Sequence, residues 1–283
     1  MLKPLFSFLF FFGLLYPVLN AQSGWTKAKG AWYAQTTVSY FASDRYYSTA
    51  GNLNIGNTFR NYTLNAYGEY GISDRLTAIV NLPLLKLQNF NVTETVAGIG
   101  DLQFGVKYGI AKKIPIAFSL AVEVPTDDGR LFANAKEVNE LGIRERINLP
   151  ASDGEWNVRS ALAISQSIGR TTYASWYGAI NYRTEGFTHQ WQSGIEAGHL
   201  FFDRLWLIGK LQVQDRLSDE VNSSVSFLYG EGTTYTAYQF NLLYHLTDHW
   251  RLTAAFHSYT DLLVARRNIY DGRTFSLGIA LEY

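Results

Sequence analysis

Cysteine is absent from all 283 residues of the chain. Its absence excludes disulfide bonds, thiolate metal sites and nucleophilic thiols. The chain also lacks an excess of either charge, because 24 lysines and arginines balance 24 aspartates and glutamates. No broad electrostatic field would therefore attract nucleic acid. We expect no cofactor, no metal and no nucleic-acid partner, and any ligand must be recognised locally.

Long apolar runs are missing too, except at the N-terminus. There a predominantly apolar run, broken only by Ser7 and Gly13, extends from Leu5 to Leu15 and is followed by the small residue Ala21. A bilayer-spanning helix needs about 20 apolar residues, whereas a secretory signal needs fewer. The pattern predicts a cleaved signal peptide over 1–21 and a mature domain over 22–283, with an uncleaved anchor helix as the alternative.

Aromatic residues are abundant: 19 Tyr, 18 Phe and 7 Trp make up 16% of the chain. Tyrosine and tryptophan favour positions with one apolar and one wet side, as in the interfacial girdles of membrane proteins. After the N-terminal run, no stretch is long and apolar enough for a membrane helix. If the mature chain lies in a membrane, it crosses as strands.

Alternation of apolar and polar residues predicts about twelve strands of roughly 10 to 14 residues, a length that suits a tilted membrane strand. The predicted segments are 31–42, 58–71, 75–85, 98–110, 114–125, 155–168, 171–183, 190–201, 204–216, 233–246, 250–260 and 272–283.

The links between these segments alternate in length. Short links are predicted at 72–74, 111–113, 169–170, 202–203 and 247–249, and longer polar links at 43–57, 86–97, 126–154, 184–189, 217–232 and 261–271. Short turns on one side and long loops on the other are typical of outer-membrane barrels. The fold is therefore predicted to be all-β: a transmembrane, antiparallel, up-and-down β-barrel.

The longest link, 126–154, mixes acidic, basic and apolar residues. Loops of this length are usually functional or disordered. It could form a short helix or fold inward as a constriction. We expect a gate rather than a mobile extracellular flap.

The alternation also assigns a lipid face and a lumen face to each strand. A register shift of one residue would place charges in hydrocarbon, at about 2 to 4 kcal/mol for a central Lys or Arg. The lipid-facing set includes Leu102, Phe104, Val106, Tyr108, Ile116, Phe118, Leu120, Leu205, Leu207, Leu211, Val213, Tyr238, Phe240 and Leu242. The lumen-facing set includes Asn65, Gln103, Gln212, Gln214, Gln239, Asn241, His257 and Glu282.

Charged residues of the lumen face are the candidate site. Opposite charges on an enclosed wall are expected to pair, because an isolated buried charge is expensive. They either fill and hydrate the barrel or line a conduit and select solutes, as charge rings do in pores. The candidates are Glu69, Lys107, Glu123, Arg159, Glu196 and Lys210.

Catalytic signatures are weak. A barrel hydrolase needs a serine and a histidine on one face. His257 and Ser258 are adjacent, so they point to opposite faces of a strand. We expect no enzyme activity, although a lipid-hydrolysing or acyl-removing barrel remains an alternative.

The chain ends on an alternating strand, FSLGIALEY, with an aromatic last residue. It resembles the closing strand of bacterial outer-membrane barrels and their assembly signal, through Gly278, Leu281 and Tyr283. Leu277 replaces the usual polar residue before the glycine. The resemblance implies recognition by the barrel assembly machinery through Tyr283.

Two further stretches, AGIGDLQFGVKYGI at 97–110 and SLAVEVPTDDGR at 119–130, resemble a family of outer-membrane proteins associated with the meta-pathway (MetA-pathway) of phenol degradation. Asp127 stands where that family has glycine. The resemblance implies a monomeric barrel that passes small, often aromatic or hydrophobic compounds across the outer membrane.

The sequence thus predicts an outer-membrane channel or transporter for passive or gated passage of small molecules, with membrane lipid and a solute as partners. A non-conducting structural or surface-binding barrel is a further alternative. About ten residues separate Gln22 from the first strand, which we expect to be too few for an N-terminal plug.

Overall fold

The computed structural model describes residues 23–219 and 230–283, so the predicted signal peptide lies outside the described residues. The structure is built from β-strands: β1(Trp32–Tyr47), β2(Leu53–Ser73), β3(Leu76–Phe90), β4(Val96–Gly98), β5(Leu102–Ala111), β6(Ile116–Val124), β7(Phe132–Asn134), β8(Arg146–Asn148), β9(Asn157–Ile168), β10(Thr172–Arg183), β11(Gln190–Phe201), β12(Leu205–Arg216), β13(Tyr235–His245), β14(Trp250–Thr260), β15(Ile269–Tyr270) and β16(Arg273–Glu282). In these two ranges, no helix is long and apolar enough to cross a membrane.

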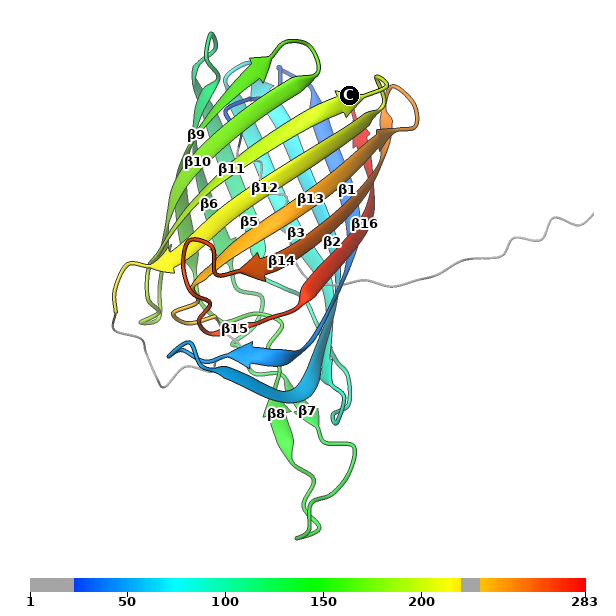
Figure 1. The fold of residues 1–283 in the computed structure, drawn as a ribbon, viewed down its shortest axis with the longest axis vertical. Helices are drawn as coiled ribbons and strands as arrows, with labels where there is room; N and C mark the ends of the chain where they lie inside the picture. The colour runs from blue at the N-terminus through cyan, green and yellow to red at the C-terminus, as the bar shows by residue number, and fades with distance from the viewer. Residues whose placement is uncertain (1–22, 220–229) are drawn as a thin grey trace, which may run out of the picture.

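Twelve of the strands close into a barrel (Figure 1). Their order around the wall is β1, β2, β3, β5, β6, β9, β10, β11, β12, β13, β14 and β16, and β1 pairs with both β2 and β16. Every neighbouring pair in this wall is antiparallel. The predicted up-and-down barrel of about twelve strands is confirmed.

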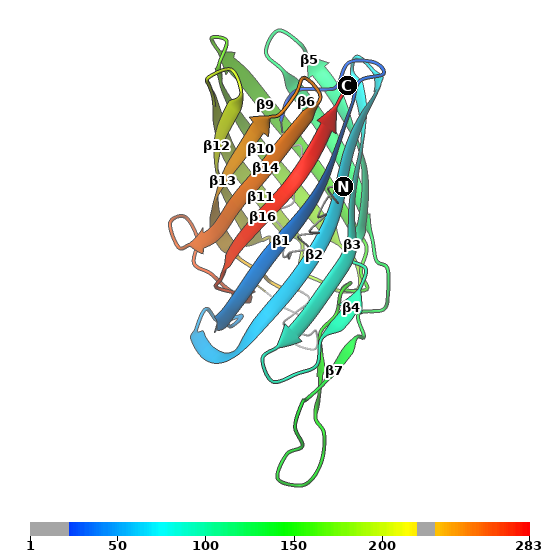
Figure 2. The ribbon, with the colours of Figure 1, turned by 90° about the vertical axis from the view of Figure 1, so that its right-hand side faces the viewer.

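Each predicted segment coincides with one barrel strand, but three strands run further than expected. β1 continues to Tyr47, β2 starts at Leu53 and β3 continues to Phe90. The predicted loop 43–57 is therefore mostly paired strand, with Arg45 opposite Ile55. Side-chain alternation missed these extensions because they project past the wall of the barrel, where neither face meets hydrocarbon (Figure 2).

The barrel has two unlike ends. At one end, here called the turn end, the connections are 74–75, 112–115, 169–171, 202–204 and 246–249. At the other, here called the loop end, they are 48–52, 91–101, 125–156, 184–189, 217–234 and 261–272. The predicted segregation of short and long links holds, apart from 48–52.

The longest loop forms a hairpin, β7–β8, and the expectation of a short helix there is wrong (Figure 1). Near its tip, the side-chain oxygen of Asn139 accepts hydrogen bonds from the amides of Leu141 and Ile143. Gly142 adopts a positive φ of 74°, a conformation that glycine tolerates and a helix does not. The tip points away from the barrel, so it does not enter the lumen.

The base of this hairpin is buried at the loop end. Leu149 and Ala133 pack with Phe41, Phe59 and Phe90, which come from the first three strands. Their apolar cluster covers part of the barrel mouth, so the base of the loop does constrict the opening.

The two faces of the wall differ as predicted. Outward residues such as Phe104, Leu207 and Phe240 are exposed, whereas inward residues such as Lys107 and Gln239 are buried. Aromatic side chains on the outside gather near both ends: Trp32, Tyr70, Tyr108, Tyr244, Trp250 and Tyr283 at the turn end, and Tyr40, Tyr62, Trp156 and Tyr182 at the loop end. These two groups correspond to the predicted girdles.

Candidate functional site: a charged lumen

All six predicted site residues face the interior, and the structure brings them together in oppositely charged pairs. Lys107 Nζ lies 4.0 Å from Glu69 Oε1. Lys210 and Glu196 form a direct ion pair across β12 and β11. Arg159 and Glu123 are diagonal neighbours, because Arg159 pairs with Ala121 and Glu123 with Asn157.

Near the turn end, tyrosine hydroxyls also bind the carboxylates. Tyr67 donates a hydrogen bond of 2.6 Å to Glu69, and Tyr173 donates one to Glu196. Glu282 is paired with Lys27 and, at 3.1 Å, with Arg251. Together with their cations, Glu69, Glu196 and Glu282 form a charged ring near the turn end. Each of the three carboxylates is held by at least one cation, so the ring carries charges of both signs.

The segment before β1 folds into the barrel at the turn end. The ammonium of Lys107 donates a hydrogen bond of 3.2 Å to the carbonyl of Trp25. The indole of Trp25 packs edge-on against Tyr173, with ring centroids 5.5 Å apart. The amide of Lys27 donates to Thr77 Oγ1 at 2.9 Å. The segment does not form a plug with a fold of its own, but its contacts with wall residues place it inside the lumen at this end.

Glycine allows this segment to lie close against the wall. The amide of Gly24 donates a hydrogen bond of 2.8 Å to Ser165 Oγ. A Cβ on Gly24 would lie 2.0 Å from the carbonyl oxygen of Pro115. Because no side chain fits there, the position requires glycine.

A cavity of about 370 Å³ remains beside the segment. It is lined by the segment itself and by the charged ring: Trp25, Lys27, Tyr33, Tyr67, Glu69, Tyr173, Glu196, Lys210, Asn241 and Glu282 are among its walls. A space of this size admits a small molecule and excludes a polymer. Its walls offer aromatic rings, carboxylates, amines and amides together.

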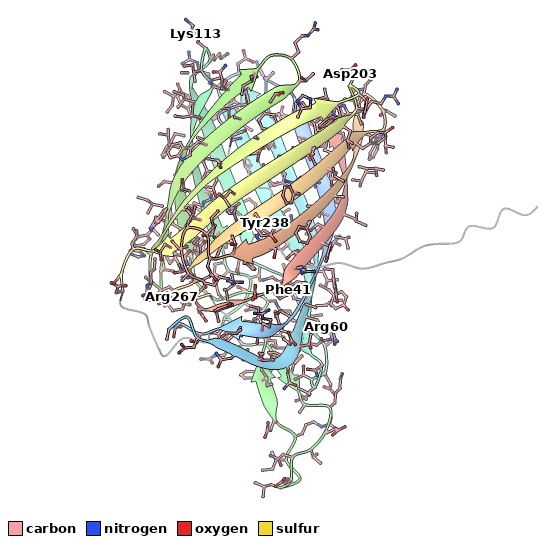
Figure 3. All side chains as sticks on the ribbon, viewed as in Figure 1. Phe41, Arg60, Lys113, Asp203, Tyr238 and Arg267 are labelled. Carbon is pink, nitrogen blue, oxygen red and sulfur yellow. The ribbon has the colours of Figure 1, made fainter. Side chains whose placement is uncertain are left out.

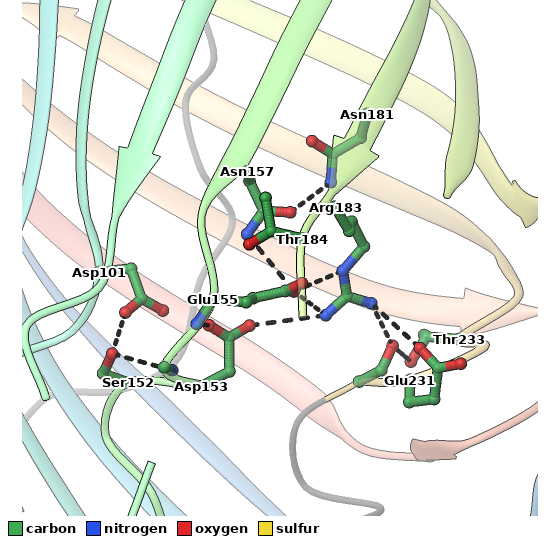
Figure 4. A network of polar contacts seen from close by, with 12 residues as sticks. Asp101, Ser152, Asp153, Glu155, Asn157, Asn181, Arg183, Thr184, Glu231 and Thr233 are labelled. Carbon is green, nitrogen blue, oxygen red and sulfur yellow. Dashed lines mark hydrogen bonds and ion pairs between the residues drawn. The ribbon is translucent and has the colours of Figure 1, made fainter. Parts of the chain in front are cut away.

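A second network of polar contacts lies at the loop end, as Figure 4 shows. Arg183, at the end of β10, pairs with Glu155 and lies 3.5 Å from Asp153 and 4.0 Å from Glu231. Glu231 also accepts hydrogen bonds from the amide and the hydroxyl of Thr188, at 2.9 and 2.6 Å. One buried guanidinium therefore joins three segments that are distant in the chain.

Beside this network, Ser152 donates a hydrogen bond to Asp101, and Lys86 donates one to the carbonyl of Ala151. Burial raises the pKa of Asp101 to about 6, with the charge of Asp153 adding to the rise and Lys86 opposing it. Burial likewise raises the pKa of Glu155 to about 9, although Arg183 opposes it. Asp101 and Glu155 therefore titrate above the usual range of a carboxyl.

The residues of this loop-end network were missed in the sequence. Asp153 and Glu231 lie in loops, where no periodicity indicates which way a side chain points. Glu155 and Arg183 did carry a signal, because they continue the inward parity of Arg159 on β9 and of Tyr177 on β10.

The structure does not assemble a hydrolase from His257 and Ser258. His257 is buried in the lumen, whereas Ser258 belongs to the outward row of β14, opposite Tyr238. Over residues 23–219 and 230–283, no group of three or more histidine, aspartate or glutamate side chains is placed to hold a metal ion.

No model of a known protein family matches this chain, and no curated protein matches its sequence. The resemblance to the MetA-pathway family is therefore not confirmed and stays a prediction.

Solved structures do match. An outer-membrane channel from Pseudomonas putida F1 is 13% identical, with a TM-score of 0.66 over 92% of this chain and 98% of that one. The translocator domain of the autotransporter NalP from Neisseria meningitidis is 10% identical, with a TM-score of 0.52 over 91% and 90%. The β domain of the Bordetella autotransporter BrkA is 11% identical, with a TM-score of 0.51 over 90% and 99%. At these identities the likeness concerns the fold, and the chain has the fold of an outer-membrane β-barrel.

Proposed function

We propose that the protein is a conduit for small molecules in the outer membrane of a Gram-negative cell and that it is not an enzyme. The observation that carries this proposal is a cavity of about 370 Å³, lined by paired charges and aromatic rings, inside a barrel whose outer face is apolar. A structural barrel does not require such a cavity. The likeness to a solved outer-membrane channel supports the same reading.

The orientation follows from the unequal ends. Short turns face the periplasm and long loops the exterior in bacterial barrels. The turn end, with the N-terminal segment, would then face the periplasm, and the hairpin β7–β8 would project outside. The C-terminal Tyr283, which exchanges backbone hydrogen bonds of 2.8 and 2.9 Å with Trp32, would be the residue that the assembly machinery reads.

The closed ends make this a gated conduit. The N-terminal segment closes the turn end, and the Arg183 network with the apolar cluster closes the loop end. The six predicted lumen charges would act in solute selection rather than catalysis. A twelve-stranded barrel has a narrow lumen, so the solutes are small, and aromatic or hydrophobic compounds are the first to test.

Liposome swelling and planar-bilayer recording test this function on mature protein and on a variant that lacks residues 23–29. We expect a small conductance from the mature protein and a larger one from the deletion. The shift of folded barrels on unheated gels verifies that both are folded. If neither folded protein conducts or admits any solute, the conduit is refuted. Lipid hydrolysis by such a protein would favour the enzyme alternative.

A further inference from the structure

The outer face of the barrel is layered where the first and last strands meet. β2, β1 and β16 lie side by side (Figure 2), and their register places residues in rows that run at right angles to the tilted strands. From the loop end to the turn end, the outward rows are Arg60–Ala42–Arg273, Tyr62–Tyr40–Phe275, Leu64–Val38–Leu277, Ala66–Thr36–Ile279, Gly68–Ala34–Leu281 and Tyr70–Trp32–Tyr283.

The rows follow one another from the loop end to the turn end, and because the strands are tilted each row runs oblique to the membrane plane. The two aromatic rows are eight residues apart, so they lie roughly 26 Å apart along the strands and somewhat less along the membrane normal, given the strand tilt. The residues between them are apolar or small, apart from Thr36. The row of Arg60 and Arg273 lies directly beyond the aromatic row of Tyr40 on its loop-end side, and Figure 3 labels Arg60 there. If the aromatic row lies at the membrane interface, the two arginines reach the lipid headgroups.

Arg60 and Arg273 flank the small residue Ala42. Two strand spacings separate their Cα atoms by roughly 10 Å, which long side chains can bridge toward one ligand. Within residues 23–219 and 230–283, neither guanidinium forms an ion pair. Even Asp44, two residues beyond Ala42 on β1, is paired with neither. Most other arginines of the loop end do have a carboxylate partner, Arg183 and Arg266 among them.

We propose that Arg60 and Arg273 form a binding site for the phosphate group of an anionic lipid headgroup in the outer leaflet. Guanidinium groups bind phosphate through paired N–H donors. Tyr40, Tyr62 and Phe275 directly below provide the interfacial surface on which the glycerol or sugar part of the lipid rests. The acyl chains then lie along Val38, Leu64 and Leu277. The site would fasten the seam between β1 and β16 to the membrane.

This inference rests on the proposed orientation in the outer membrane, and native mass spectrometry of the full mature protein in detergent tests it. The probe is a diphosphorylated lipid A, compared with its dephosphorylated form. Each basic residue near an anionic lipid surface contributes about 1 kcal/mol, so the double variant Arg60→Ala, Arg273→Ala should bind the phosphorylated lipid about 30-fold more weakly. The matched control is Arg130→Ala, Arg144→Ala, which removes two exposed arginines of loop 125–156, off the barrel wall, and should bind as the parent does.

Equal binding by the folded double variant and the parent protein would overturn the proposal, as would equal binding of the dephosphorylated lipid. Displacement of the lipid by millimolar inorganic phosphate would show a site for free phosphate and would also overturn it. Conductance of the same samples separates the two proposals. A parent protein that binds the phosphorylated lipid but does not conduct would refute the conduit and leave the lipid site standing.

Discussion

The ammonium of Lys107 donates a hydrogen bond of 3.2 Å to the main-chain carbonyl of Trp25. The lysine side chain is 2% exposed, and the carboxylate of Glu69 lies 4.0 Å away. A buried ammonium is costly unless it is paired and hydrogen-bonded. Lys107 therefore has a partner on the wall, Glu69, and another in the N-terminal segment, Trp25, and this contact holds the segment against the wall.

Removing the ammonium of Lys107, which donates this hydrogen bond, should open the turn end. In Lys107→Met, the carbonyl of Trp25 loses its partner, and we expect a larger single-channel conductance together with faster tryptic cleavage after Lys27 and Lys29. The exposed Lys112, in the turn 112–115, provides the control Lys112→Met, which should change neither. Unchanged conductance and protection in a folded Lys107→Met protein would contradict the role of this contact.

Adding a side chain at Gly24 should displace the same segment by a steric route. The Cβ of Gly24→Val would lie 2.0 Å from the carbonyl oxygen of Pro115, and overpacking of this kind costs about 1 to 3 kcal/mol. We expect increased conductance with the barrel intact. Gly56→Val is the matched control, since nothing lies within 4 Å of the Cβ position there. If both variants behave like the parent, the segment is not held where the structure places it.

Loss of Arg183 should release the loop end. In Arg183→Met, Glu155 loses its hydrogen-bond donor and Glu231 loses its cation, and breaking a buried pair in this way costs about 3 to 5 kcal/mol. We expect the base of loop 125–156 to detach, measured as faster limited proteolysis within 146–155. The exposed Arg130 supplies the control Arg130→Met. Equal cleavage rates in the two variants would show that the network does not hold the loop.

Ion selectivity should depend on pH through the loop-end carboxyls. A carboxyl is neutral below its pKa and negative above it. Because burial raises the pKa of Asp101 to about 6 and that of Glu155 to about 9, the mouth gains negative charge as the pH rises from 5 to 10. The ratio of cation to anion permeability should rise in two steps. Glu155→Gln should remove the upper step and keep the lower one, whereas a flat profile in the parent would contradict the assignment.

A charge on the outer wall should destabilise the barrel only within the hydrocarbon layer. Ile279 lies in the row midway between the two aromatic rows, so Ile279→Arg should lower the free energy of unfolding from bilayers by about 2 to 4 kcal/mol. Leu141→Arg at the exposed tip of the hairpin should have little effect. Equal stability of the two variants would place Ile279 outside the hydrocarbon.

The sequence alone determined the number of barrel strands, their order along the chain and the side of each strand that faces lipid. The reason is local. A strand that contacts hydrocarbon needs an apolar side chain at every second position, so each strand shows this alternation independently of its neighbours. The inward direction of Lys107, Glu196 and Lys210 followed from that alternation without knowledge of any partner.

The closure of the lumen was decided only by the tertiary structure. Trp25 and Lys107 are 82 residues apart in the chain, and Arg183 meets the carbonyl of Gly230 across 47 residues. Neither the N-terminal segment nor the loops have a periodic pattern, because their residues do not alternate between a hydrocarbon environment and a polar lumen. Their positions depend on individual hydrogen bonds, ion pairs and close contacts that exist only once the barrel has brought its ends together.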